Sequence, residues 1–245
     1  MATIGDNLQA VKTRIERAAV AARRDPAEVT LLAVSKTHPA AAIKEALAAG
    51  QRAFGENYVQ EAREKMELLP EVEWHLIGPL QSNKTRLAAE RFHWVHTLAS
   101  EKIARRLSEQ RPAALPPLNV LIQVNVSGEA TKAGVSPGAV FALSQETNSL
   151  TGLRLRGLMA IPEPTADARL QRSRFAQARS IFEDLKSKGL AFDTLSMGMS
   201  DDMESAIAEG ATLVRIGTAI FGSRQPDSEL RACVWGPRTA SNSNS

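Results

Sequence analysis

The sequence predicts a (β/α)8 barrel, and three observations lead to this fold class. Short apolar runs of strand length alternate with stretches of helical periodicity, which is the pattern of parallel strands joined by crossover helices. Eight such strands occur along the chain, with a helix between each pair. The length of 245 residues also matches the size of about 250 that is usual for such barrels. A doubly wound open sheet is the alternative, but the short strands favour the closed barrel.

The elements are predicted in order from the periodicity of apolar residues. An extra amphipathic helix over residues 5–23 comes first, because apolar side chains recur there at steps of three and four, at Leu8, Val11, Ile15, Ala18 and Ala22. The predicted strands are 30–35, 52–55, 73–78, 94–97, 119–126, 154–161, 193–198 and 213–217. The predicted helices after them are 39–49, 57–68, 83–91, 99–110, 136–150, 167–188 and 201–209.

Several element boundaries carry chemical markers. Proline tolerates the first helical position because its missing N–H would be unpaired there, and Pro39 and Pro137 stand at such positions. Ser136 and Ser200 are expected to act as helix N-caps. Glycines follow three of the apolar helical runs, as C-terminal glycines do, at Gly50, Gly189 and Gly210. We therefore expect one barrel domain over residues 1–235 and a disordered polar tail over 236–245.

The composition excludes several classes of protein. The chain has 30 Lys and Arg residues against 27 Asp and Glu, a net charge of +3, which is too slight for a nucleic-acid-binding face. The single cysteine, Cys233, excludes a disulfide framework and a cysteine-rich metal site. His93 and His96 lack a third ligand at metal spacing, so no metal is predicted. Residues 1–24 lack the apolar core of an export signal, and no run of about 18 apolar residues occurs. We therefore expect a cytoplasmic protein with no membrane partner.

In a barrel of this kind the functional residues gather at the C-terminal ends of the strands. Lys36 follows the apolar run LLAVS, and a lysine that is partly desolvated in this way exposes a nucleophilic amine suited to a Schiff base. A lysine that only extends its amine into solvent is the simpler interpretation. His75, inside the third strand, is interpreted as a hydrogen-bonded core residue.

The loops after the last two predicted strands are small and rich in donors. Residues 198–202 (GMSDD) and 217–222 (GTAIFG) offer free backbone N–H groups where barrels commonly bind phosphate. Ordinary caps and turns explain the same residues, and Asp201 and Asp202 would repel a phosphate unless they point outward. Arg215 lies within the apolar run LVRIG, so it needs a partner if buried. That partner is either a neighbouring carboxylate or a ring nitrogen of a bound cofactor.

Five motifs together resemble one known family. They are LLAVSKTHP at 31–39, FGENYVQE at 54–61, WHLIGPLQSNK at 74–84, GLMAIP at 157–162 and LSMGMSDDMESAIAEGATLVRIGTAIFG at 195–222. In this order they are similar to the pyridoxal 5'-phosphate homeostasis proteins, the YggS/PROSC group. The resemblance spans about residues 5–225, and only the tail lies outside it.

The resemblance implies a fold, a cofactor and a set of site residues. It implies a single barrel of the pyridoxal phosphate (PLP) fold type III, like the N-terminal domain of alanine racemase. PLP would be held as a Schiff base on Lys36, with its phosphate at Ser200, Gly217 and Thr218. Asn57 would lie nearby, and Arg215 would face the pyridine nitrogen. The family members are regarded as carriers or regulators in vitamin B6 balance that supply PLP to apo-enzymes. We expect a monomer.

The residues themselves also favour a binding protein over an enzyme. Only 23 of the 245 residues follow Gly222, too few for the second domain that completes the site of a racemase of this fold. An arginine at the ring nitrogen would resist protonation of the ring and weaken it as an electron sink. A PLP-dependent racemase or lyase stays open as the alternative, with Tyr58 as its acid–base group. A phosphosugar enzyme that uses the same phosphate loops is a third interpretation.

Overall fold

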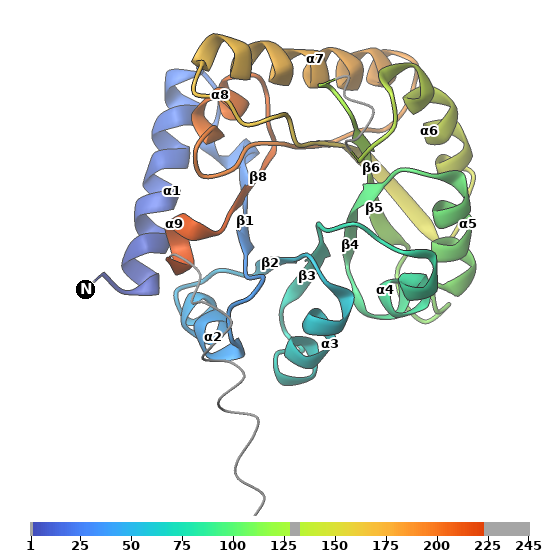
Figure 1. Cartoon of the computed structure of the whole chain (residues 1–245), viewed down its shortest axis with the longest axis horizontal. Helices are drawn as coiled ribbons and strands as arrows, with labels where there is room; N and C mark the ends of the chain where they lie inside the picture. Colours follow the sequence, from blue (N-terminus) through green and yellow to red (C-terminus); the bar gives the residue numbers. More distant parts are fainter. Residues whose placement is uncertain (1, 128–132, 223–245) are drawn as a thin grey trace, which may run out of the picture.

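The computed structural model describes residues 2–127 and 133–222, and its strands form one closed parallel barrel in the order β1-β2-β3-β4-β5-β6-β7-β8. Figure 1 shows the helices around the outside of this ring. The predicted (β/α)8 barrel is therefore confirmed, and the open sheet is excluded because β1 pairs with β8, in the register Leu32↔Arg215. The strands are β1 Thr30–Val34, β2 Ala53–Glu56, β3 Glu73–Leu76, β4 Trp94–Leu98, β5 Leu118–Val124, β6 Leu153–Ala160, β7 Thr194–Ser196 and β8 Leu213–Ile216.

The helices alternate with the strands as the sequence predicts, with four additional short elements. The α-helices are α1 Ile4–Ala21, α2 Ala40–Ala48, α3 Val59–Leu68, α4 Thr85–Arg91, α5 Glu101–Gln110, α6 Val140–Asn148, α7 Ala168–Ser187, α8 Met203–Ala208 and α9 Thr218–Phe221. Three 3-10 helices, η1 Pro26–Glu28, η2 Ser82–Lys84 and η3 Pro137–Ala139, precede β1, α4 and α6. The sequence predicts neither α9 nor η1, because three or four residues are too few to show a helical period.

Helix α1 closes the ring of helices where the helix after β8 is very short. It packs beside α2, α8 and α9 (Figure 1). Its buried side chains include Leu8, Val11 and Ile15, as the helical period predicts. The Thr3 hydroxyl accepts the Asp6 N–H, and the Asp6 carboxylate accepts the Thr3 N–H, a capping box that fixes where the helix begins.

Some of the predicted boundary markers are confirmed and others are wrong. Gly50, Gly189 and Gly210 follow their helices with φ near +90°, a conformation that glycine adopts without strain. The N-cap of α8 is Asp202 instead of Ser200, because β7 and α8 are shorter than predicted and leave a six-residue loop between them. Ser136 is the N-cap residue of η3, as predicted, but its side chain forms no capping hydrogen bond. Pro39 lies one position earlier than predicted, at the N-cap of α2.

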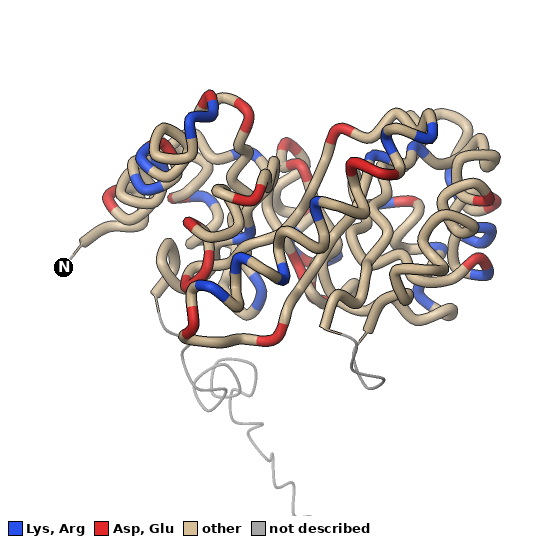
Figure 2. The backbone as a smooth tube through the Cα atoms, turned by 90° about the horizontal axis from the view of Figure 1, so that it is seen from above, with Lys and Arg blue, Asp and Glu red and all other residues tan. Residues whose placement is uncertain are grey.

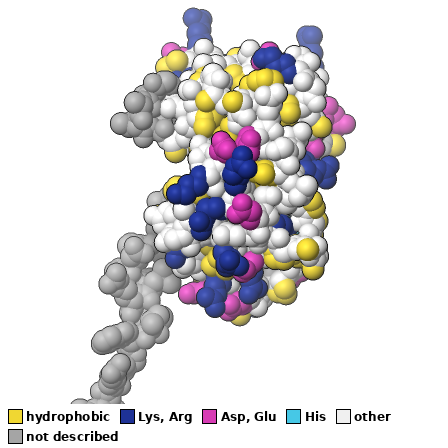
Figure 3. Space-filling view, turned by 90° about the vertical axis from the view of Figure 1, so that its right-hand side faces the viewer, with side chains coloured by type: hydrophobic (Ala, Val, Ile, Leu, Met, Phe, Trp, Pro, Cys, Tyr) yellow, Lys and Arg dark blue, Asp and Glu magenta, His cyan; other side chains and the backbone are white. Residues whose placement is uncertain are grey.

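Charged residues of both signs are spread over the outer helices. Figure 2 shows Lys and Arg residues interspersed with Asp and Glu along the tube. The face drawn in Figure 3 likewise has no large field of one sign. Within the described ranges, no helix is long and apolar enough to cross a membrane. The predicted tail over 236–245, the end of the predicted domain at 235 and Cys233 lie outside the described residues.

Candidate functional site

Lys36 lies in a tight turn at the C-terminal end of β1. The His38 N–H donates to the Ser35 carbonyl at 3.1 Å, which closes the turn around Lys36 and Thr37. Thr37 has φ +66°, an uncommon conformation for a β-branched residue that persists only where neighbouring contacts impose it. Lys36 itself is partly buried, as its predicted place at the rim of the barrel requires. The backbone around the lysine is therefore held in a specific shape.

A buried ion cluster, formed by Glu56, Glu61 and Lys65, holds this turn. Lys65 lies on α3, and its ammonium donates to Glu56 Oε1 at 2.7 Å, to Glu61 Oε1 at 2.7 Å and to the Ser35 carbonyl at 2.9 Å. These three bonds use all three donors of an ammonium group. Glu61 Oε1 also accepts the Thr37 N–H at 2.6 Å. The ion cluster thus binds the backbone on both sides of Lys36.

Glu56, the last residue of β2, is fully buried and completes this cluster. Its Oε1 accepts the Ser35 hydroxyl at 2.6 Å, while its Oε2 is buried without a hydrogen-bond partner among the described residues. Burial raises the pKa of the Glu56 carboxyl, and the Lys65 ammonium opposes that change. The cluster therefore carries a real desolvation cost, which its short bonds offset.

Asn57 follows Glu56, and its backbone lies against Gly78 at the end of β3. A Cβ atom on Gly78 would come within 2.1 Å of the Asn57 carbonyl oxygen, so any larger residue there would displace Asn57. The Thr97 hydroxyl also donates to the Gly78 carbonyl at 2.8 Å. This close contact positions Asn57, which is half-buried, at the same end of the barrel as Lys36.

Arg215 lies on β8 with its guanidinium inside the barrel. The residue is 4% exposed, and it donates to the Ser196 hydroxyl at 2.7 Å and to the Ala160 carbonyl at 3.0 Å. No carboxylate of the described residues forms an ion pair with it, so one of its two predicted alternatives, the ion pair, is wrong. Burial lowers the pKa of Arg215 to about 10, and the Asp202 carboxylate opposes this. The remaining N–H groups are available to an acceptor within the barrel.

The loop after β7 brings Ser200 to this end of the molecule. Asp202 turns back over the loop, and its carboxylate accepts the Met199 N–H at 2.6 Å, so one predicted phosphate donor is already used. The Ser200 carbonyl accepts a hydrogen bond from Arg14 of α1 at 3.2 Å. The Ser200 N–H has no acceptor among the described residues.

The loop after β8 passes directly beside β1. A Cβ atom on Gly217 would come within 3.2 Å of the Val34 carbonyl oxygen, and Phe221 stacks on His38 with ring centroids 5.0 Å apart. The N–H groups of Gly217 and Thr218 find no acceptor in the described part of the chain. The segment from Val34 to His38, which contains Lys36, thus lies beside the segment from Gly217 to Phe221 across the β1–β8 seam.

Sequence reasoning misses two parts of this site. Lys65 is one, although it shares the buried side of α3 with Val59, Ala62 and Met66, and a lysine at such a spacing is a signal that could identify it. His96 is the other, since it is fully buried in contact with His75. The interpretation of His75 as a hydrogen-bonded core residue is confirmed. Within the described ranges, no group of three or more His, Cys, Asp and Glu side chains could hold a metal.

Comparisons with known proteins show which family and which fold the chain is similar to. The family model of the alanine racemase N-terminal domain matches residues 7–225. A pyridoxal phosphate homeostasis protein from Pseudomonas aeruginosa is 61% identical over 226 residues, 91% of this chain and 97% of the relative. The structure of PipY from Synechococcus elongatus, solved with PLP bound, is 40% identical at a TM-score of 0.79 and covers 90% of this chain and 100% of its own.

A more distant structure shares the fold alone. An alanine racemase from Clostridium difficile is 16% identical at a TM-score of 0.70, and the match covers 91% of this chain but 58% of the racemase. The barrel is therefore common to both, whereas the long, high-identity matches place the chain with the homeostasis proteins. On its sequence, its barrel and its motifs, this chain belongs to the pyridoxal phosphate homeostasis protein family and contains the alanine racemase N-terminal domain.

Proposed function

We propose that this protein binds PLP at the C-terminal end of its barrel and serves PLP homeostasis in the cytoplasm. It holds the cofactor covalently on Lys36 and supplies or buffers it for apo-enzymes. The observation that carries this proposal is Arg215, a buried cation with no carboxylate partner in the described residues, on the strand that pairs with the strand leading to Lys36. The PLP-bound structure of a 40% identical relative supports it.

The donors at this end of the barrel fit the two polar parts of PLP. The unpaired N–H groups at Ser200, Gly217 and Thr218 suit a phosphate dianion, which loop amides and oriented backbone dipoles stabilise. The guanidinium of Arg215 is a donor without acceptor capacity, so it suits a pyridine nitrogen that is unprotonated. Asn57 lines the adjoining loop.

The chain's own residues prepare Lys36 for this role. When bound, PLP supplies an aldehyde carbon that a lysine amine attacks reversibly with loss of water. The ion cluster holds the backbone of Ser35 and Thr37 on either side of the lysine. The side chain of Lys36 therefore extends from a rigid turn. Lys36 is partly buried, and the neutral form of its amine is the nucleophile.

We further propose that the protein holds PLP without turning over amino acids. Tyr58 is 60% exposed, so its hydroxyl is not held against the other site residues as a positioned acid or base would be. A guanidinium with a pKa of about 10 also leaves the ring nitrogen unprotonated, which weakens the ring as an electron sink.

Reductive trapping tests the covalent assignment. Borohydride treatment of the PLP-loaded protein, followed by peptide mass spectrometry, is expected to label the peptide that contains Lys36. Lys36→Ala is expected to lose both the label and the yellow colour. Lys44→Ala, on the exposed side of α2, is the matched control and keeps both. Label found on another lysine, with Lys36→Ala still yellow, would refute the assignment.

Two further assays separate the remaining alternatives. Pyridoxal without its phosphate is expected to bind at least about tenfold more weakly, because each charge-assisted hydrogen bond is worth roughly 1.5–3 kcal/mol. Equal affinity for both forms would refute the phosphate site. The loaded protein is also incubated with alanine, serine and threonine. Turnover at about 1 per second or faster, abolished in Lys36→Ala, would favour the racemase or lyase.

A further inference from the structure

A line of buried polar side chains crosses the interior of the barrel from Arg215 to the opposite mouth. Arg215 Nη1 lies 2.7 Å from Ser196 Oγ, and Ser196 Oγ lies 3.2 Å from His96 Nδ1. His96 Nε2 lies 2.9 Å from His75 Nδ1, and His75 Nε2 lies 3.0 Å from Glu73 Oε1. Ser196, His96 and His75 are all buried. We call Glu73, His75, His96 and Ser196 the relay.

The two ends of the line determine the direction of every bond in it. Arginine can only donate, and an ionised carboxylate can only accept. Burial lowers the pKa of both His75 and His96 below the ordinary value of 6.5, so at pH 7 we expect each ring to be neutral and to carry one N–H. His75 must then donate from Nε2 to Glu73, which leaves its Nδ1 as the acceptor for His96 Nε2–H. His96 Nδ1 in turn accepts the Ser196 hydroxyl, whose oxygen accepts Arg215.

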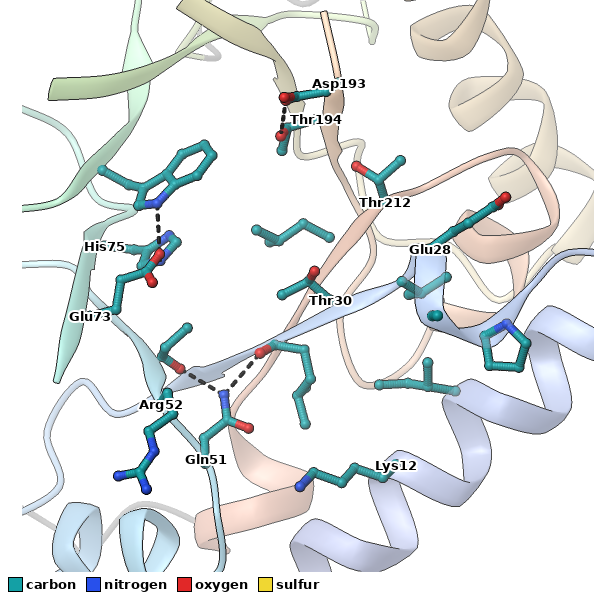
Figure 4. A pocket seen from close by; sticks show the side chains of 18 of the residues that line it. Lys12, Glu28, Thr30, Gln51, Arg52, Glu73, His75, Asp193, Thr194 and Thr212 are labelled. Carbon is teal, nitrogen blue, oxygen red and sulfur yellow. Dashed lines mark hydrogen bonds and ion pairs between the residues drawn. The ribbon is translucent and has the colours of Figure 1, made fainter. Parts of the chain in front are cut away.

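The Glu73 end of the relay is anchored at the N-terminal mouth of the barrel. Glu73 Oε1 also accepts the indole N–H of Trp94 at 2.7 Å, and that indole stacks on His75 with centroids 5.2 Å apart. Both Glu73 and His75 line a cavity of about 860 Å³. Figure 4 shows the two side chains together on the β3 wall of this cavity. Glu73, the acceptor that sets the direction of the bonds, is thus held in place by a second donor, the indole of Trp94.

The Arg215 end of the relay meets the cofactor site. The Ser196 hydroxyl holds Nη1 and the Ala160 carbonyl holds Nη2, so the plane of the guanidinium is fixed from two strands. No side-chain N or O atom of the relay or of Arg215 is both fully buried and unsatisfied. A buried cation with no carboxylate partner among the described residues owes its position to these neutral acceptors.

We propose that the relay is a positioning device that orients Arg215 toward the ring nitrogen of bound PLP, and that Glu73, at the far mouth of the barrel, sets its direction. The proposal rests on the function proposed above. It assigns roles to four side chains on β3, β4 and β7 that do not contact the cofactor themselves.

The test uses protein loaded with PLP that carries ¹⁵N at the ring nitrogen. Ser196→Ala is expected to shift the ring-nitrogen resonance and to release PLP faster, on the order of tenfold, since it removes one hydrogen bond to a charged group. Ser144→Ala, at another fully buried serine that bonds only to its own helix, is the matched control and changes neither quantity. Borohydride trapping on Lys36 is expected to succeed in both variants.

A second pair of variants tests the Glu73 end of the relay without creating a cavity in the core. Glu73 has a side chain that is 47% exposed, so substitutions there leave the packing intact. Glu73→Gln keeps an acceptor oxygen for His75 and is expected to leave the ring-nitrogen resonance near that of the wild type. Glu73→Leu deletes the acceptor and is expected to shift the resonance in the same direction as Ser196→Ala.

The outcomes separate the two proposals. An unchanged ring-nitrogen resonance in both Ser196→Ala and Glu73→Leu, with normal trapping on Lys36, would overturn the relay alone. Wild-type protein that holds no PLP on Lys36 would overturn the proposed function and the role of the relay with it. If Ser196→Ala does not fold, the Glu73 pair alone decides.

Discussion

Two buried polar groups support the proposed PLP site, and they are built on opposite principles. The ion cluster of Glu56, Glu61 and Lys65 holds the turn around Lys36 through charges, and it leaves Glu56 Oε2 buried without a partner among the described residues. The relay connects Arg215 to the half-exposed carboxylate of Glu73 through a hydroxyl and two imidazoles, and none of its buried side-chain N or O atoms lacks a hydrogen-bond partner. Buried charges hold a backbone strongly, but removing one partner of a buried ion pair is costly. A series of hydrogen bonds through uncharged side chains instead fixes the orientation of the group at its end, with a smaller desolvation cost.

The largest effect expected from this comparison is on the ion cluster. Lys65→Met leaves Glu56 and Glu61 without their cation, which is expected to lower the free energy of unfolding by about 3–5 kcal/mol. Arg63→Met, on the same helix, removes an exposed pair with Glu67 and is expected to cost less than about 1 kcal/mol. Urea denaturation measures both variants.

A double variant sharpens that result. Lys65→Met combined with Glu56→Gln is expected to be more stable than Lys65→Met alone, because the unpaired buried charge is removed with its partner. If Lys65→Met costs no more than Arg63→Met, the turn at Lys36 does not depend on the ion cluster.

The relay is expected to show itself in the pH dependence of stability. Burial lowers the pKa of His75 and His96 from the ordinary value of 6.5. Well above pH 6.5 both rings are neutral in the folded and the unfolded chain, so they contribute no pH dependence. Below it the unfolded chain binds protons that the folded chain does not. The free energy of unfolding therefore decreases as the pH is lowered, by up to about 1.4 kcal/mol per histidine for each pH unit.

Urea denaturation of the wild type and of His96→Gln between pH 5 and 8 measures this contribution. The variant is expected to lose stability less steeply below pH 6.5, since one of the two buried imidazoles is gone. Equal slopes for the two proteins would mean that His96 is protonated in the folded state and that the relay is not neutral.

The smallest effect concerns the strained residue beside Lys36. Glycine adopts the φ of +66° seen at Thr37 without a steric cost, but it adds freedom to the unfolded chain. Thr37→Gly is therefore expected to change the free energy of unfolding by less than about 1 kcal/mol. A loss well above that, measured by thermal denaturation, would show that the Thr37 side chain itself stabilises the turn.

The sequence predicts the barrel well because its signal is local. Eight apolar runs and the helical periods between them lie within short windows of the chain, and the glycine at the end of a helix, such as Gly50, is a neighbour of that helix. Positions at the strand ends follow from the fold class, so the sequence alone is enough to assign Lys36, Gly217 and Thr218 to one end of the barrel.

The supporting polar groups could not be predicted in the same way because their contacts are distant in sequence. His96 and Ser196 are 100 residues apart, and no local pattern distinguishes this histidine from one at the surface. Ser200 fails as an N-cap because the start of α8 depends on how Asp202 folds back over its loop. Lys65 is only nine residues from Glu56. Its spacing with the apolar residues of α3 is a local signal for burial, but its charge favours a solvated position.

The tautomers of His75 and His96 test the central claim most directly. The account requires that every hydrogen bond between Arg215 and Glu73 be donated toward Glu73. Both rings must then be neutral and carry their proton on Nε2, whether or not PLP is bound. Long-range ¹H–¹⁵N NMR of the imidazole rings at pH 7 reads the protonated nitrogen of each histidine. We expect two neutral Nε2–H rings in the wild type. A proton on Nδ1 of either ring, or a doubly protonated imidazolium, would contradict the relay.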